Sequence, residues 1–346
     1  MKMRIKLISL VIALSVCNTA YGGEDAALWE RYKTDFISED GRVIDYHQNQ
    51  ISHSEGQGYG MMLAVIHNDR AVFDSLWLWT KNNIKVRTDN LFTWSWGKRY
   101  DGQWSVIDYN NATDGDILIA YSLLKAYEKW NDKGYKNETV KIIEDIRKKL
   151  AITWQGHTFL LPSYYGFVKE NGFVLNPSYF IFPAFRYFAE VDDRLFWEKV
   201  YKDSLFLITQ SCFGKLCLPA DWVILKDEKV SVYENSSSYF GAEAIRVLLY
   251  MSSEKKAQFP KGVDKILEMY KQIGYLPSRI DLEKDSFSLK PAPAGYYAVY
   301  ALAAKNMGDD VLSKRLFKEA RERLDAEEKS YYSFNLYLLA VNGYLF

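Results

Sequence analysis

Apolar residues recur at helical spacing along most of the chain. In the segment 113–130, apolar side chains return every three or four positions between polar ones. Acidic residues that favour a helix start precede several segments, as Asp69 does before Arg70 and Asp309 does before Val311. The pattern predicts about a dozen helices, with approximate spans of 25–36, 55–67, 70–83, 113–130, 137–153, 178–190, 193–210, 236–252, 260–272, 291–306, 309–325 and 331–344.

Shorter segments rich in aromatic or β-branched residues lie between these helices. They are candidates for strands and cover 91–96, 103–108, 158–161 and 164–175. The chain lacks the strand–helix alternation and the glycine patterns of nucleotide-binding folds. We therefore expect an all-α fold of consecutive helical hairpins, in one domain over residues 23–346. A tetratricopeptide solenoid is the alternative, because 291–325 resembles one such unit, but no period of about 34 residues persists.

Residues 1–22 have the pattern of a secretory signal peptide. Lys2, Arg4 and Lys6 precede an apolar run over 7–17, which is shorter than the roughly 20 residues that a membrane span needs. Small residues at Ala20 and Gly22 then suit cleavage before the next residue. We expect a soluble protein that is periplasmic or secreted, with an uncleaved membrane anchor as the alternative.

Composition narrows the choice of partners. The chain carries 44 Lys and Arg against 44 Asp and Glu, and this balance argues against a nucleic-acid-binding protein. Its 10 Trp, 26 Tyr and 19 Phe are an unusually large set of rings. Trp and Tyr join a flat apolar face to a polar edge, which suits sugar rings, although many rings in any protein belong to the core.

Removal of residues 1–22 leaves two cysteines, Cys212 and Cys217. An oxidising compartment favours a disulfide between them, and two free buried thiols are the alternative. The four histidines show no ligand spacing for zinc. We expect neither a metal nor an organic cofactor.

Candidate chemistry gathers in acidic residues among aromatic ones. The segment SEGQGYGM at 54–61 places Glu55 where a loop leads into a helix. Burial among rings raises the pKa of such a carboxyl and suits it to general acid catalysis. The alternative for Glu55 is a structural acid in the first turn of a helix, where the helix dipole favours it.

Asp114 and Asp116 lie at the start of the next strongly periodic segment. At this spacing they cannot share one helix face, so one is free to point into a cleft while the other caps or braces the helix. A calcium loop is a weaker alternative, because the remaining oxygen ligands of an EF-hand are absent. Trp94 and Trp96 lie between the two acidic segments and form a candidate platform for sugar rings, with buried packing as the alternative.

These segments resemble glycoside hydrolase family 8, and most closely its periplasmic endoglucanases associated with bacterial cellulose synthesis. The run from Ala112 to Trp130 is similar to the family's long signature, and 54–61 resembles the segment that holds its proton donor. Further matches extend over the mature chain, at 41–45, 96–98, 176–179, 221–222, 274–277 and 331–332.

The resemblance implies an (α/α)6 barrel and hydrolysis of β-1,4-glucans or related polymers with inversion of configuration. In an inverting mechanism, one carboxylic acid protonates the glycosidic oxygen and a second carboxylate activates water from the opposite face. By match, Glu55 is the general acid and Asp114 grips the sugar at the cleavage point. The further candidates are substrate-binding residues, namely Tyr59, Trp94, Trp96, Asp116, Tyr179, Arg246 and Tyr332.

The chain departs from the family at the position of the general base. The family's usual segment reads Ser-Tyr-Asp-Ala-x-Arg, whereas 241–246 reads GAEAIR, so that Glu243 stands at the aspartate position. Its side chain reaches one methylene further, and a misplacement of about 1 Å can cost about 100-fold in rate.

Three interpretations of this departure remain. Glu243 serves as a displaced base, or Glu234 or Asp221 replaces it, or catalysis is weak and the protein is mainly a glycan-binding accessory of a polysaccharide secretion system. The expected partners are a polysaccharide substrate and components of a polysaccharide synthase or export complex. We expect a monomer that binds no nucleic acid.

Overall fold

A computed structural model describes residues 25–233, 238–254 and 258–343. The predicted signal peptide lies outside these residues. No helix within the described ranges is both long and apolar enough to cross a membrane.

The described chain is mostly helical, as predicted. Eleven helices follow a first helical segment over residues 25–36. They are α2 (Ser54–Ile66), α3 (Arg70–Asn83), α4 (Thr113–Trp130), α5 (Lys133–Leu150), α6 (Phe182–Phe188), α7 (Arg194–Gln210), α8 (Ile245–Met251), α9 (Val263–Ile273), α10 (Ala294–Asn306), α11 (Asp310–Ala326) and α12 (Tyr331–Asn342), with a short 3-10 helix, η1 (Pro177–Tyr179).

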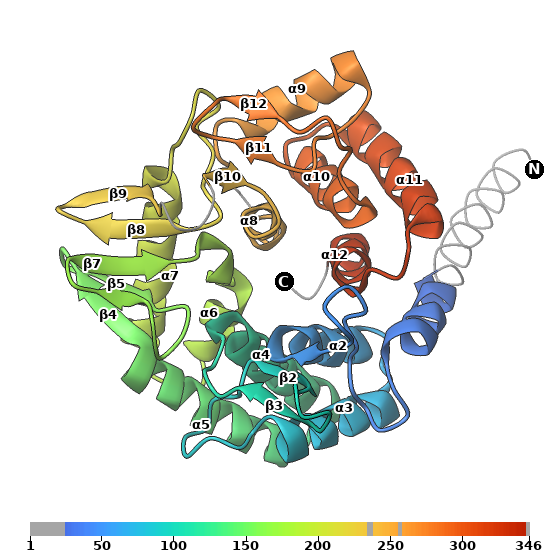
Figure 1. Ribbon diagram of the computed structural model, residues 1–346, viewed down its shortest axis with the longest axis vertical. Helices are drawn as coiled ribbons and strands as arrows, with labels where there is room; N and C mark the ends of the chain where they lie inside the picture. Colours follow the sequence, from blue (N-terminus) through green and yellow to red (C-terminus); the bar gives the residue numbers. More distant parts are fainter. Residues whose placement is uncertain (1–24, 234–237, 255–257, 344–346) are drawn as a thin grey trace, which may run out of the picture.

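The helices form two rings, one inside the other (Figure 1). The inner helices α2, α4, α6, α8, α10 and α12 contact one another in this order, and α12 returns to contact α2. The inner helices are buried on nearly every side, as along Ala294–Ala304 of α10, whereas outer helices such as α5 and α11 bury one face only. Contact between the last helix and α2 closes the ring and excludes an open solenoid.

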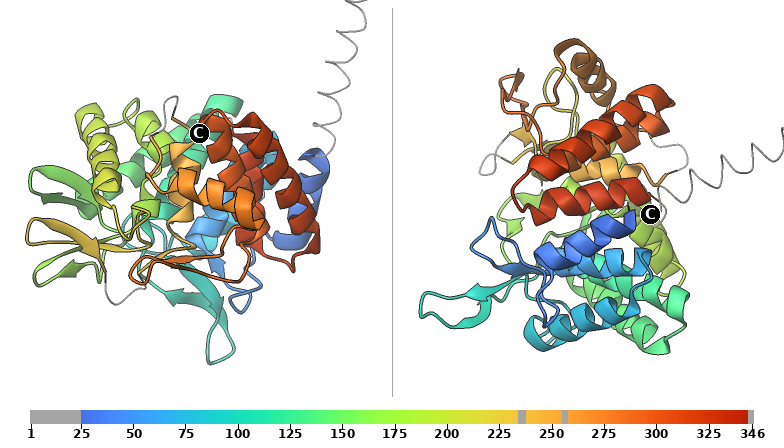
Figure 2. Two further views of the ribbon diagram at one scale, coloured as in Figure 1. Left: turned by 90° about the horizontal axis from the view of Figure 1, so that it is seen from above. Right: turned by 90° about the vertical axis from the view of Figure 1, so that its right-hand side faces the viewer.

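Short antiparallel strands gather at one end of the helical ring (Figure 2). One sheet contains β1 (Ser52–His53), β2 (Ser95–Lys98) and β3 (Trp104–Asp108). A second contains β6 (Val168–Lys169), β7 (Gly172–Leu175), β8 (Val223–Lys226) and β9 (Lys229–Val232). The others are β4 (Ala151–Trp154) with β5 (His157–Leu160), and β10 (Tyr239–Phe240), β11 (Ile280–Asp281) and β12 (Ser286–Phe287).

Several predicted helix bounds are wrong. The helix predicted from 137 begins at Lys133, and the helix predicted from 178 begins at Phe182, after η1. The helix predicted over 137–153 stops at Leu150, because 151–154 pairs with 157–160 as a hairpin whose turn has positive φ at Gln155 and Gly156. The helix predicted over 236–252 begins only at Ile245. The turn that precedes it carries Glu243, so this shorter helix belongs to the geometry of the candidate site.

The predicted disulfide is confirmed. Cys212 and Cys217 are bonded in the loop that follows α7, and Phe213 pairs with Leu218 across the same loop. The bond closes a local turn at the edge of the fold and lies outside the pocket described below.

Candidate active site

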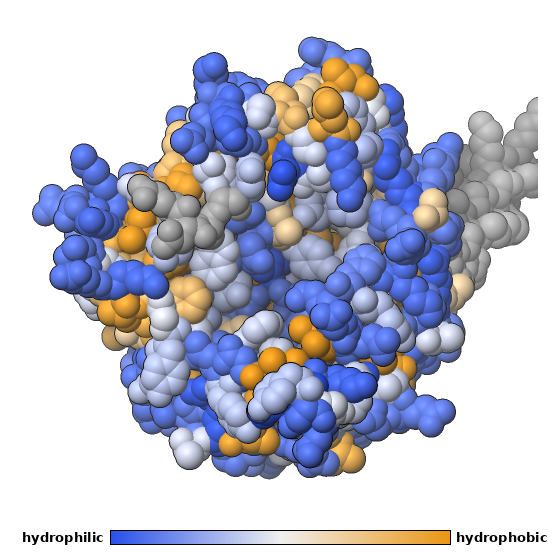
Figure 3. Space-filling view, in the orientation of Figure 1, coloured by the Kyte–Doolittle hydropathy of each residue, from blue (hydrophilic) through white to orange (hydrophobic). Residues whose placement is uncertain are grey.

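A pocket of about 380 Å³ opens between the N-terminal ends of α2, α4, α8 and α12. The face that carries it is hollowed near its middle and mostly hydrophilic around the hollow (Figure 3). Its lining brings together residues from distant parts of the chain, including Glu55, Trp94, Asp114, Tyr179, Glu243, Arg246 and Tyr332.

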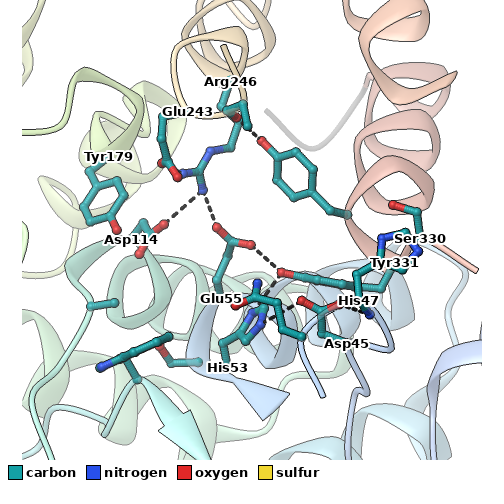
Figure 4. A pocket seen from close by; sticks show the side chains of 16 residues that line it. Asp45, His47, His53, Glu55, Asp114, Tyr179, Glu243, Arg246, Ser330 and Tyr331 are labelled. Atoms are coloured by element: carbon teal, nitrogen blue, oxygen red, sulfur yellow. Dashed lines mark hydrogen bonds and ion pairs between the residues drawn. The ribbon is translucent and has the colours of Figure 1, made fainter. Parts of the chain in front are cut away.

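One arginine connects the three candidate catalytic acids (Figure 4). Arg246 contacts Glu55 and Asp114 through Nη1, the latter at 3.0 Å from Oδ2, and Glu243 through Nη2. The arginine side chain is only 2% exposed, against 15% for Glu55 and 33% for Glu243. A buried guanidinium needs such partners, because an unpaired charge in the interior is costly.

Glycines bring the first two acids together. Glu55 and Asp114 are each the second residue of their helices, α2 and α4. A Cβ on Gly58 would lie 2.5 Å from Cβ of Leu118, and one on Gly115 would lie 2.1 Å from Oγ of Ser54. Since any side chain at either position would force the helices apart, these glycines allow both carboxylates to reach the same guanidinium nitrogen.

The electrostatic surroundings give Glu55 and Asp114 different pKa values. Burial raises the pKa of Asp114 to about 8; the neighbouring Glu55 and Glu243 add to the rise, and Arg246 opposes it. Burial also raises the pKa of Glu55, but Arg246, His53 and hydrogen bonds from Tyr331 and Asp114 outweigh it and hold that pKa below its ordinary value. Burial of Asp114 and the cation beside Glu55 thus move the pKa values of the two carboxyls in opposite directions.

Glu243 is held through one of its oxygens. Asn176 donates to Oε2 of Glu243 at 2.9 Å and Arg246 is the second donor, while the Ser178 hydroxyl oxygen lies 3.3 Å from the same carboxylate oxygen. Asn176 also accepts hydrogen bonds from the backbone nitrogen and hydroxyl of Ser178, which fixes its amide. The carboxylate of this glutamate, which is one methylene longer than an aspartate, thus lies within hydrogen-bond distance of these donors.

Asp221 lies behind the turn that carries Glu243, not in the pocket lining. Its Oδ1 accepts from the backbone nitrogens of Gly241 at 2.9 Å and Ala244 at 2.8 Å. Burial raises the pKa of Asp221 to about 7, although these two hydrogen bonds lower it in part. The geometry makes Asp221 a support for the turn rather than an alternative base, while Glu234, the other alternative, lies outside the described residues.

Four of the seven candidate substrate-binding residues line the pocket, namely Trp94, Tyr179, Arg246 and Tyr332. The indole nitrogen of Trp94 donates to Asp108 at 2.8 Å, which leaves its ring partly exposed. The rings of Tyr179 and Tyr332 lie 5.7 and 5.9 Å from the Arg246 guanidinium carbon. These rings border the carboxylate cluster, where a sugar would lie.

The other three candidates do not line this pocket. Tyr59 is fully buried and bonds the Tyr250 hydroxyl at 2.9 Å. Trp96 packs against Trp79 and Trp104, with ring centroids 5.2 and 5.4 Å away.

Asp116 braces the loop before α4. It accepts from the backbone nitrogen of Phe92 at 2.8 Å and from the side chain of Asn111 at 2.7 Å, which uses both of its oxygens inside the protein. The spacing argument that only one of the two aspartates reaches a cleft therefore holds, with Asp114 in the pocket.

Asp45, His53 and Tyr331 are among the pocket residues that the sequence analysis did not name as functional candidates. Asp45 and Tyr331 lay within the matching segments, and His53 directly precedes the segment that holds Glu55. Within the described part of the chain, no group of three or more His, Cys, Asp or Glu side chains is placed to hold a metal ion.

Comparison with known proteins agrees with this geometry. The chain is 41% identical over 227 residues to an endoglucanase from Cellulomonas uda, covering 65% of this chain and 62% of that protein. The crystal structure of a family 8 endoglucanase from Klebsiella pneumoniae superposes with a TM-score of 0.81 at 32% identity, over 92% of this chain and 98% of that one. An endo-β-1,4-glucanase from Acetobacter xylinum gives 0.81 at 29% identity, over 92% and 97%.

The model of the glycosyl hydrolases family 8 matches residues 2–344. The match includes both helix starts that carry Glu55 and Asp114, and the turn that carries Glu243. The chain therefore belongs to glycosyl hydrolase family 8.

Proposed function

We propose that this family 8 hydrolase cleaves a β-1,4-glucan or a related polysaccharide internally and with inversion of configuration. The observation that carries the proposal is the contact of Glu55, Asp114 and Glu243 with the single guanidinium of Arg246. Similarity to endoglucanases, one of them an endo-β-1,4-glucanase, supports the choice of substrate.

Glu55 is the general acid in this proposal and protonates the glycosidic oxygen of the leaving sugar. Glu243 is the general base and takes a proton from the attacking water, on the opposite side of the sugar ring. The two donors to Oε2 of Glu243 come from Asn176 and Arg246, and they support this role because they fix the carboxylate. Asp114 holds the sugar at the cleavage point, where its raised pKa lets it donate a hydrogen bond.

The proposed enzyme is a single-domain barrel that is exported from the cytoplasm. The closed inner ring and the family relationship support an (α/α)6 barrel in one domain over 23–346. Residues 1–22 serve as a signal peptide, and the mature monomer acts in the periplasm or outside the cell. Its partners are the polysaccharide and components of a polysaccharide synthase or export complex.

The proposal is tested by incubating the purified protein with soluble cellulose derivative, mixed-linkage glucan, xylan and chitosan. Release of reducing ends from the first two, with a rapid fall in viscosity, is expected of an endo-acting glucanase. Proton NMR during the first turnovers should show the α-anomer of the new reducing end, because inversion converts the β-linkage. Binding without release from any member of the panel would instead support a glycan-binding accessory.

A further inference from the structure

A chain of hydrogen bonds leads away from the candidate general acid. The Tyr331 hydroxyl lies 2.8 Å from Oε1 of Glu55 and 2.9 Å from Nδ1 of His53. The other ring nitrogen of His53, Nε2, lies 3.1 Å from Oδ2 of Asp45. All four residues line the pocket, and they come from α2, α12, β1 and the loop before it (Figure 4).

The number of hydrogens limits how these bonds can be made. Tyr331 has one hydroxyl proton, so it donates to Glu55 or to His53 but not to both. If it donates to an ionised Glu55, Nδ1 of His53 must donate to the tyrosine oxygen. Since Nε2 also donates to the Asp45 carboxylate, His53 is then an imidazolium.

A second arrangement contains the same number of protons. Glu55 carries a proton and donates to the tyrosine oxygen, Tyr331 donates to Nδ1, and His53 is neutral. The two arrangements interconvert when the Nδ1 proton of His53 passes to Tyr331 while the Tyr331 hydroxyl proton passes to Oε1 of Glu55. One N–H bond and one O–H bond break, two O–H bonds form, and Nε2–H remains on Asp45 throughout.

We propose that His53, held by Asp45 and connected through Tyr331, stores the proton that Glu55 gives to the leaving group. The inference rests on the proposed function. Glu55 contacts the Arg246 cation, which favours the ionised form of the carboxyl. A general acid at this position therefore needs a proton source that sugar binding can draw on, and the tyrosine bridge provides one without passing through solvent.

Charged groups around the imidazole fit this role. Asp45 faces His53 from the preceding loop, Glu55 acts on it from α2, and Tyr331 contacts it from α12. Arg246 of α8 lies on the other side of Glu55. Trp94, which precedes β2, adds an uncharged ring at 6.5 Å. The carboxylates of Asp45 and Glu55, at the two ends of this series of hydrogen bonds, balance the imidazolium. A proton can therefore be kept on His53 or moved to Glu55 without a net change in charge.

The proposal predicts the pH profile of two positioning variants. His53→Asn keeps a polar group near Nδ1 but cannot store a proton, and Tyr331→Phe removes the bridge alone. In both, the alkaline limb of kcat/KM should move to lower pH by about 1 unit or more, because a carboxyl alone then holds the proton that an imidazole held before. The double variant should move it no further than either single one.

The matched control is a second histidine–aspartate pair. Nδ1 of His157 lies 2.9 Å from Oδ1 of Asp203, outside the pocket. His157→Asn should leave the profile unchanged. An alkaline limb that stays in place in the His53 and Tyr331 variants, with kcat lowered equally at every pH, would overturn the proposal and leave Asp114 as the proton source.

A second measurement needs no turnover, so it separates this inference from the proposed function. The imidazole nitrogens of His53 are followed by 15N NMR against pH and assigned with His53→Asn. At a given pH, Glu55→Gln should move the Nδ1 signal of His53 from the position of a protonated nitrogen toward that of an unprotonated one, because it removes the carboxylate at the far end. The difference should shrink in the Tyr331→Phe background. Identical His53 curves in the wild type and Glu55→Gln would overturn the proton store, whatever the protein hydrolyses.

Discussion

Asn176 donates a hydrogen bond of 2.9 Å from its side-chain nitrogen to Oε2 of Glu243. Together with the contact from Arg246, this bond holds the glutamate that stands where the resemblance led us to expect the shorter aspartate. The departure from the family pattern is thus accompanied by donors at the matching distance. It supports Glu243 as the base.

We predict that Glu243→Gln lowers kcat by about 10²–10⁴-fold, the usual contribution of a general base. Glu243→Asp should also lose activity, by about 100-fold, because its carboxylate retreats by roughly 1 Å from the Asn176 and Arg246 donors. Both are measured as reducing ends released from soluble cellulose derivative. Full activity in Glu243→Ala would mean that water is activated elsewhere.

Glu55→Gln should lower turnover by about 10²–10⁴-fold while glycan affinity changes little. The amide keeps the shape, and its one oxygen still accepts from Arg246 while its nitrogen takes the position that faces Tyr331, but it has no acidic proton to transfer. Affinity is measured by calorimetry with an oligosaccharide, and turnover by product release. A variant that keeps more than about a tenth of the wild-type rate would exclude Glu55 as the acid.

The disulfide between Cys212 and Cys217 should be present in protein isolated from the periplasm. Mass spectrometry without reductant should then give a mass about two hydrogens below that of the dithiol. Replacing both cysteines by serine should cost about 2 kcal/mol, because so short a loop restricts the unfolded chain only modestly. Chemical denaturation measures this cost, and activity should stay unchanged because the bond lies outside the pocket.

Local patterns were sufficient for the parts of the site that lie within single segments. Periodicity placed the starts of α2 and α4 within a residue of where they are, and the spacing of Asp114 and Asp116 indicated that only one could face a cleft. The end of α5 and the start of α8 could not be found this way. At these places, strand pairing and the hydrogen bonds of Asp221 override apolar periodicity.

Contacts between distant segments could not be predicted at all. Tyr331 lies 278 positions from His53 and 276 from Glu55, yet its hydroxyl contacts both. Nothing in the sequence around His53 indicates that the ring meets Asp45 on one side and Tyr331 on the other. Similarly, Tyr59 and Trp96 look like sugar-binding rings in sequence, but closure of the helical ring buries the first and packs the second against Trp79.

The side chain of Asp221 supports the turn that carries Glu243. Asp221→Asn keeps an oxygen to accept from the nitrogens of Gly241 and Ala244, so activity should stay within about a factor of three of the wild type. Asp221→Ala leaves both backbone nitrogens without this acceptor, and the loosened turn should lower kcat by about 10–100-fold. Loss of activity in both variants alike would return Asp221 to consideration as the base.

Comparison of Asp221→Asn with the wild type also tests whether the buried Asp221 carboxyl changes its charge with pH. Burial raises the pKa of Asp221 to about 7 in the folded protein, above the value near 3.9 of an unfolded aspartate. The folded state thus binds the proton more tightly. This contribution to stability is complete below about pH 4 and is lost as the pH rises through about 7. Asp221→Asn, which has no charge to bury, should therefore gain stability relative to the wild type between pH 5 and pH 8, by roughly 2.5 kcal/mol. Urea unfolding of both proteins at the two pH values measures the difference, and a constant gap between them would mean that Asp221 does not change its charge in this range.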